Sequence, residues 1–183
     1  MNVLDMSLFS LINAGAGTPA WRIHCAAFVS NVLPAATVLA IALLALARPE
    51  RRQTLWVALA SMLVTWIAVT AFRTWLPLPR PGALEVGIQW VSHSDRGSFP
   101  SLHAAGSFAV AMAYLLERRD RWALMLVVAA AAIAGSRVYL GLHFPTDVMA
   151  GALVGSLAAL SAHRVATWRR RAPAEPRAKR VLT

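Results

Sequence analysis

Long apolar runs constrain this chain more than any other feature of its sequence. A helix needs about 20 predominantly apolar residues to cross a hydrocarbon core of about 30 Å. The 183 residues contain five such runs. The runs lie between Arg22 and Arg48, from about Gln53 to Trp75, from just after Pro100 to the charged cluster 117–121, from Trp122 to about Leu140, and from about Pro145 to Trp168. The sequence therefore predicts an all-α, polytopic transmembrane helix bundle with five spans.

The segments at the two ends of the chain have a different character. Val3 to Ile12 is apolar but only about ten residues long, and the helix breaker AGAGTP follows it. It is too short to span, so we expect an interfacial or re-entrant helix, with a six-span variant if it does cross. No basic residue precedes Arg22, unlike in a secretory signal peptide, so we expect the N-terminus to be retained. We predict an integral-membrane domain over 1–168 and a basic tail over 169–183.

The composition excludes several other classes of protein. With 58% hydrophobic and 14% charged residues, the chain has too little polar surface for an ordinary soluble domain. The net charge of +10 does not indicate a nucleic-acid partner, because basic nucleic-acid binders carry many Lys and Arg on a polar surface. The single cysteine, Cys25, lies in an apolar run and excludes a disulfide scaffold. The bilayer is therefore the expected partner.

The distribution of the basic residues predicts the orientation of the helices. Thirteen of the 18 Lys and Arg fall on one side of the predicted spans, and five fall on the other. The larger group comprises Arg48, Arg51, Arg52, Arg118, Arg119, Arg121 and the seven basic residues from Arg164 onward. Since cytoplasmic loops carry the excess of Lys and Arg, this side and the C-terminus should be cytoplasmic.

Three polar stretches lie on the opposite, outward side. They run from Arg73 to Pro81, from Phe99 to His103, and from Ser136 to Asp147, each at the end of a predicted span. Ionisable residues at membrane ends are first candidates for a functional site. The cations are Arg73, Arg80 and Arg137, and guanidinium groups bind phosphate oxygens bidentately at any working pH. The residue types therefore predict a site for a phosphate ester or diphosphate.

The remaining side chains of these stretches fit phosphoryl transfer. A helix that starts after Pro100 and Ser101 offers backbone N–H groups and a positive dipole end to an anion. His143 precedes Asp147 by four residues, so the carboxylate can hold one ring nitrogen and leave the other as a nucleophile. His103, one turn into its helix, is placed to protonate the leaving oxygen.

The same residues resemble the signature of the type-2 phosphatidic-acid phosphatase superfamily. That signature is Lys, six residues, Arg-Pro; then Pro-Ser-Gly-His; then Ser-Arg, five residues, His, three residues, Asp. The order and internal spacings match over about 75 residues. The matching positions are Arg73, Arg80-Pro81, Pro100-Ser101-Leu102-His103, Ser136-Arg137, His143 and Asp147. Two positions depart from the signature: Arg73 replaces Lys, and Leu102 replaces Gly, which leaves less room beside the backbone N–H.

The resemblance implies a metal-independent, cofactor-free phosphatase with defined residue roles. His143 would form a phosphohistidine, Asp147 would orient it, and His103 would act as general acid and then as general base. The phosphoryl group would be held by Arg73, Arg80, Ser101, the Leu102 N–H and Arg137. The small size resembles that of bacterial undecaprenyl-diphosphate phosphatases, which implies an inner-membrane enzyme of cell-wall lipid-carrier recycling with its site on the periplasmic face.

Several alternatives remain open at this point. The near alternatives to undecaprenyl diphosphate as the substrate are phosphatidylglycerol-phosphate, phosphatidic acid and lipid A phosphates. A non-enzymatic lipid-binding or transport accessory protein is an alternative from another class. A zinc site from His93, His103 and His143 is a minor alternative, since the close histidine pairs typical of zinc enzymes are missing. His93 and Asp95 could also touch the substrate. The small-residue spacing of Gly151 and Gly155 fits internal packing as well as dimerisation, and the sequence predicts no oligomeric state.

Overall fold

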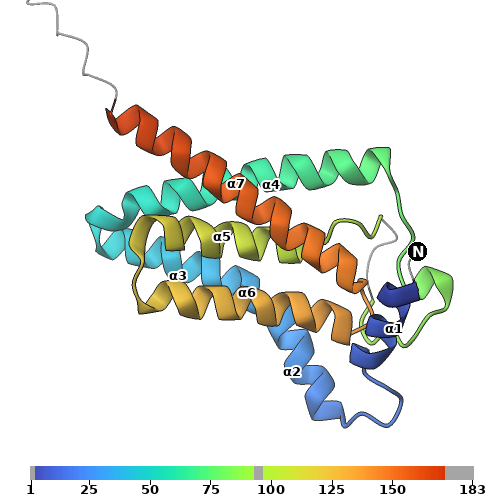
Figure 1. The fold of residues 1–183 in the computed structure, drawn as a ribbon. Helices are drawn as coiled ribbons and strands as arrows, with labels where there is room; N and C mark the ends of the chain where they lie inside the picture. The colour runs from blue at the N-terminus through green and yellow to red at the C-terminus, as the bar shows by residue number, and fades with distance from the viewer. Residues whose placement is uncertain (1–2, 93–96, 172–183) are drawn as a thin grey trace, which may run out of the picture.

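The computed structural model describes residues 3–92 and 97–171, and every regular element in these ranges is helical (Figure 1). There are seven α-helices and two short 3-10 helices in the described ranges. In chain order they are α1 (Val3–Ile12), α2 (Ala20–Asn31), α3 (Leu33–Ala47), η1 (Pro49–Arg51), α4 (Arg52–Trp75), η2 (Gly82–Leu84), α5 (Leu102–Arg118), α6 (Arg121–Tyr139) and α7 (Pro145–Arg171). The predicted all-α class is confirmed.

Helix α5 forms the centre of the bundle, where it packs against α4, α6 and α7. Its sequence places alanine on the buried faces, so neighbouring helices approach closely; Ala104, Ala105 and Ala109 have no exposed surface. Gly151 and Gly155 of α7 lie directly on the α5 backbone. The two glycines therefore serve packing within the chain.

The first predicted span is broken in the structure. Helices α2 and α3 meet at Val32 with a bend of 44°. Pro34 stands at the second position of α3, where its missing N–H and its ring prevent the α2 hydrogen-bond pattern from continuing. The sequence predicted a single helix across this proline, and the structure has two.

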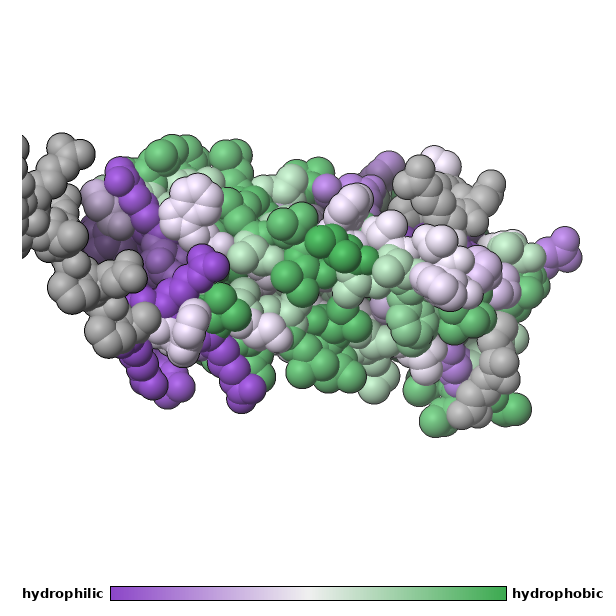
Figure 2. Space-filling view, turned by 90° about the horizontal axis from the view of Figure 1, so that it is seen from above, coloured by the Kyte–Doolittle hydropathy of each residue, from purple (hydrophilic) through white to green (hydrophobic). Residues whose placement is uncertain are grey.

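Three helical segments in the described ranges are long and apolar enough to cross a membrane: Pro49–Trp75, Arg121–Tyr139 and Pro145–Arg171. The bent α2–α3 pair makes a fourth if it counts as one span. Their apolar side chains largely face outward, and Figure 2 shows a hydrophobic middle between more polar ends. This is how helices covered by lipid differ from those of a soluble bundle. The count of five, which needs the 17-residue α5 as well, stays a prediction.

The two ends of the bundle carry different residues. At one end lie the α3–α4 and α5–α6 connections and the end of α7, which together contain the described members of the larger basic group (Figure 1). At the other end lie α1, the end of α4, the start of α5 and the α6–α7 connection, where the predicted site residues are. Helix α7 continues to Arg171, past the expected domain boundary at 168, and the rest of the predicted tail lies outside the described residues.

Candidate active site

His143 lies in the short connection between α6 and α7 and is 1% exposed. Gly141, with φ of +75°, turns the chain back directly after α6, and Pro145 then begins α7. This local geometry places His143 one turn before Asp147. Its Nδ1 lies 3.3 Å from Asp147 Oδ2, so the contact predicted from the four-residue spacing is present.

Arg80 lies on the other side of the His143 ring. Its Nη1 is 3.2 Å from Nε2 of His143 and donates to the Leu142 carbonyl at 3.0 Å. Burial lowers the pKa of His143 from 6.5 to about 3. The hydrogen bond that the imidazole donates to Asp147 and the charge of that carboxylate oppose this shift, and the charges of Arg80 and Arg137 reinforce it. The imidazole is therefore neutral at physiological pH. With Nδ1–H directed at Asp147, Nε2 carries the lone pair, which is the form a nucleophile needs.

Ser98 is a member of the site that the sequence analysis did not single out. Its side chain is fully buried, and its Oγ donates to Asp147 Oδ2 at 2.5 Å and lies 3.2 Å from His143 Nδ1. The same carboxylate oxygen also accepts from the Phe144 N–H at 2.9 Å. Ser98 therefore ties the segment before α5 to the histidine–aspartate pair. Only its place two residues before Pro100 could have drawn attention to it.

The start of α5 is fixed against the start of α7. The Ser101 N–H donates to the Asp147 carbonyl at 2.9 Å. Ser101 is fully buried, and its Oγ has no hydrogen-bond partner in the described ranges. Leu102 and His103, both half-buried, follow in the first turn of α5. The Phe99 to His103 stretch and the Ser136 to Asp147 stretch thus meet, as the sequence analysis expected.

Two further predicted phosphate ligands bind other groups of the protein in this structure. Arg73, at the end of α4, donates from Nε and Nη2 to the Pro100 carbonyl at 3.1 and 2.7 Å. Arg137 is 1% exposed, and its Nη1 donates to Ser30 Oγ of α2 at 2.7 Å. Both cations border the site, and each also holds a neighbouring segment in place.

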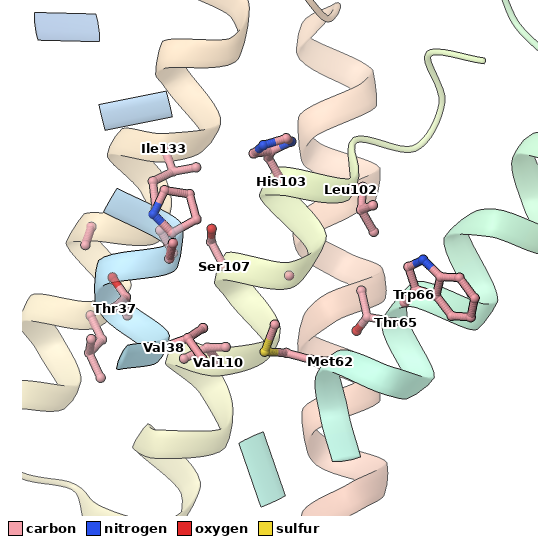
Figure 3. Close-up of a pocket in the computed structure, with 16 residues that line it drawn as sticks. Thr37, Val38, Met62, Thr65, Trp66, Leu102, His103, Ser107, Val110 and Ile133 are labelled. Carbon is pink, nitrogen blue, oxygen red and sulfur yellow. The ribbon is translucent and has the colours of Figure 1, made fainter. Parts of the chain in front are cut away.

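An apolar cavity of about 300 Å³ begins beside His103. Figure 3 shows its lining, with His103 and Leu102 at one end and Met62 and Val110 deeper in the bundle. It lies between α3, α4, α5 and α6. A cavity with this lining suits a hydrocarbon chain that enters from the bilayer.

Two alternatives of the sequence analysis involve residues outside the described ranges. His93 and Asp95 both fall in 93–96, so their contact with a substrate stays a prediction, as does the three-histidine zinc site that includes His93. Among the described residues, no group of three or more His, Cys, Asp or Glu side chains could hold a metal ion.

Comparison with known sequences identifies the family. Residues 54–171 match the sequence model described as the PAP2 superfamily, which covers all three motifs. The chain is also 37% identical over 165 residues to the protein named "Putative undecaprenyl-diphosphatase YbjG" of Escherichia coli K12. That alignment covers 87% of this chain and 81% of YbjG.

Two crystal structures have a similar fold. LpxE of Aquifex aeolicus superposes with a TM-score of 0.77 over 89% of this chain and 96% of its own, at 22% identity. A transmembrane PAP2-type phosphatidylglycerolphosphate phosphatase from Bacillus subtilis gives 0.68 over 93% of this chain and 88% of its own, at 19% identity. From the matched motifs, the helical fold and these relatives, the chain is a multi-pass membrane protein that belongs to the PAP2 phosphatase superfamily.

Proposed function

We propose that this protein hydrolyses undecaprenyl diphosphate to undecaprenyl phosphate, with His143 as the nucleophile. The observation that carries the proposal is the environment of His143: a buried, neutral imidazole with Asp147 at Nδ1 and a guanidinium at Nε2. A histidine held in this way by a carboxylate is arranged for attack on phosphorus. The cations around it favour the charge that develops on the transferring phosphoryl group.

In the first step, Nε2 of His143 attacks the terminal phosphorus, and the bond from that phosphorus to the bridging oxygen breaks. His103 gives its proton to the departing oxygen of undecaprenyl phosphate. Arg80, which donates to Nε2 and to Leu142, exchanges the Nε2 contact for an oxygen of the phosphoryl group. Arg73, Arg137, Ser101 and the Leu102 N–H complete the clamp.

In the second step, His103 takes a proton from water as the water oxygen attacks the phosphohistidine. The N–P bond breaks, inorganic phosphate leaves, and His143 returns to its neutral form. Asp147 holds the His143 ring in one orientation and stabilises the positive charge of the ring in the phosphohistidine intermediate. All atoms and protons balance without a metal or a cofactor.

Two observations support undecaprenyl diphosphate as the substrate: a cavity that suits its prenyl chain, and a relative that is named for this reaction. The cavity beside His103 is lined mainly by aliphatic side chains and leads from the site into the bundle, where a prenyl chain can lie. YbjG, which is similar over most of the chain, is named for the same reaction. We further propose five spans, an inner-membrane location, an active site on the periplasmic face and a cytoplasmic C-terminus.

The test is phosphate release by the purified full chain in detergent with excess chelator. Undecaprenyl diphosphate, phosphatidylglycerol-phosphate, phosphatidic acid and lipid A phosphates are compared at equal concentration. We expect release to be fastest from undecaprenyl diphosphate and to be abolished in His143→Ala. His24→Ala is the matched control, because His24 is exposed and lies on α2 outside the site. Faster phosphate release from another lipid would overturn the assignment of undecaprenyl diphosphate as the substrate. No release from any of the lipids would overturn the proposed phosphatase activity.

A further inference from the structure

Helix α1 reaches into the active site through a buried carboxylate. Asp5 is 7% exposed. Its Oδ1 accepts from the Thr146 N–H at 3.0 Å, and its Oδ2 accepts from Thr146 Oγ1 at 2.6 Å. Thr146 stands between Pro145 and Asp147 in the first turn of α7. The two contacts therefore hold the residue directly before Asp147, across 141 positions of the chain.

Asp5 supplies what the first turn of α7 lacks. The N–H groups at the start of a helix have no partner within the helix, and the helix dipole favours a negative charge there. The turn also carries Asp147, whose own carboxylate is already engaged by His143 and by the Phe144 N–H. Because Asp5 satisfies Thr146 from outside, Asp147 is left to serve the histidine.

Two further residues, Phe9 and Asn13, fix α1 at this place. The Phe9 ring is fully buried, and its centroid lies 5.2 Å from the ring centroid of Phe144, the residue after His143. Asn13, directly after α1, donates from Nδ2 to the carbonyls of Ile88 and Tyr139, at 3.0 and 3.1 Å. Its Oδ1 accepts from the Ile88 N–H at 2.8 Å. The end of α1 is thus bonded both to the segment after Arg80 and to the end of α6.

The backbone on both sides is shaped to receive this segment. Gly87 and Gly141 have φ of +69° and +75°, a conformation that side-chain-bearing residues rarely adopt. A Cβ on Gly87 would collide with Phe9 and Asn13, and one on Gly141 would collide with the Ile88 carbonyl. The loop that contains Gly87 and the chain that leads from α6 to His143 therefore both pass close to α1 or to Asn13, which follows it.

We propose that α1 is an integral part of the active site and that Asp5 is a positioning residue, which fixes the first turn of α7 so that Asp147 stays on Nδ1 of His143. The inference rests on the proposed phosphatase function. It assigns a role to a segment that lies outside the 54–171 family match.

The first test compares Asp5→Ala, Asp5→Asn and Ser7→Ala in the purified full chain with undecaprenyl diphosphate. Asp5→Ala should lower kcat by about tenfold or more and leave KM within about threefold, because a charge-assisted hydrogen bond near the nucleophile is lost while the phosphate ligands remain. Asp5→Asn should retain most of the activity, since its amide can accept from the Thr146 N–H and donate to Oγ1. Ser7 is exposed on the same helix, and within the described residues its hydroxyl bonds only to the Val3 carbonyl, so Ser7→Ala should match the wild type.

A second pair of variants tests the other partner of the contact and serves if Asp5→Ala does not fold. Thr146→Val removes the Oγ1 donor and should lower kcat, whereas Thr146→Ser should restore it. In Asp5→Ala, the second substitution Thr146→Val should cause little further loss. If both Asp5→Ala and Thr146→Val keep the kcat of the wild type, Asp5 is not a positioning residue. An inactive wild type would instead overturn the proposed function itself.

Discussion

Ser98 shows how a single hydroxyl group can connect two motifs. It lies within hydrogen-bond distance of both His143 Nδ1 and Asp147 Oδ2, although 45 and 49 positions separate it from them. A hydroxyl that donates to the carboxylate can still accept from the Nδ1–H through a lone pair of its oxygen, so it can fix the ring and the carboxylate together. Its loss would leave both groups in place with one fewer constraint.

We therefore predict that Ser98→Ala lowers kcat for undecaprenyl diphosphate by about tenfold, which corresponds to about 1.4 kcal/mol in the barrier, with little change in KM. Ser161→Ala is the matched control, because Ser161 is exposed and, in the part of the chain that the structure describes, its hydroxyl bonds only to a carbonyl of its own helix. Steady-state phosphate release by the two variants is the measurement. Equal kcat values for Ser98→Ala and the wild type would remove Ser98 from the site.

That the motif stretches come together at one end of the bundle could be predicted from the sequence, because the motif residues have fixed spacing and each stretch lies at an end of an apolar run. The His143–Asp147 contact follows from four residues and a helix start. The contacts of Ser98, Arg137 with Ser30, and Asp5 with Thr146 could not be predicted in this way. Each joins residues from different helices or loops, and such pairings depend on how the helices pack rather than on local sequence.

At the level of the elements, helix boundaries agree closely with the apolar runs. The ten-residue segment Val3 to Ile12 is one helix as expected, and α4 and α6 begin and end within one residue of the predicted limits. Apolar length predicts a helix well because a backbone in lipid must satisfy its own hydrogen bonds. It does not predict a break, and so the bend at Val32 before Pro34 was missed.

The α5–α7 contact gives a prediction at this scale. A Cβ on Gly155 would lie 2.9 Å from the Ala109 nitrogen and from the Ala105 carbonyl carbon. Gly155→Ala should therefore push α7 away from α5, at a cost of about 1–3 kcal/mol that exceeds the gain of about 1 kcal/mol in helix propensity. Because Ser101 directly precedes α5 and Asp147 lies in the first turn of α7, a shift between these helices also disturbs the candidate site. We therefore expect a lower melting temperature in detergent and slower phosphate release.

Gly135→Ala is the control for this substitution. Gly135 is exposed near the C-terminal end of α6, and no neighbouring segment of the described chain lies within 4 Å of the position of its Cβ, so the same change should leave the melting temperature unchanged or slightly higher. If Gly155→Ala melts no lower than Gly135→Ala, Gly155 does not set the distance between α5 and α7.

At the scale of the whole molecule, the charges separate into two groups at the two ends of the bundle. Arg48, Arg118 and Arg169 represent the three basic segments at the end far from the site, and Arg73, Arg80 and Arg137 border the site. The net charge of +10 therefore reflects mainly residues that lie far from the candidate site. Since basic residues mark the cytoplasmic side, the site should face outward.

Impermeant thiol labelling of intact bacterial cells tests this orientation. In a Cys25→Ala background, Ala83→Cys places a thiol on η2 at the site end, and Glu50→Cys places one on η1 at the basic end; both positions are exposed. We expect a membrane-impermeant maleimide to label Ala83→Cys from outside and to reach Glu50→Cys only after the cells are opened. The two variants form a matched pair, because each places one exposed thiol in a short connection of the same protein. Labelling in the reverse order would place the phosphatase chemistry on the cytoplasmic face and would exclude a periplasmic lipid diphosphate as its substrate.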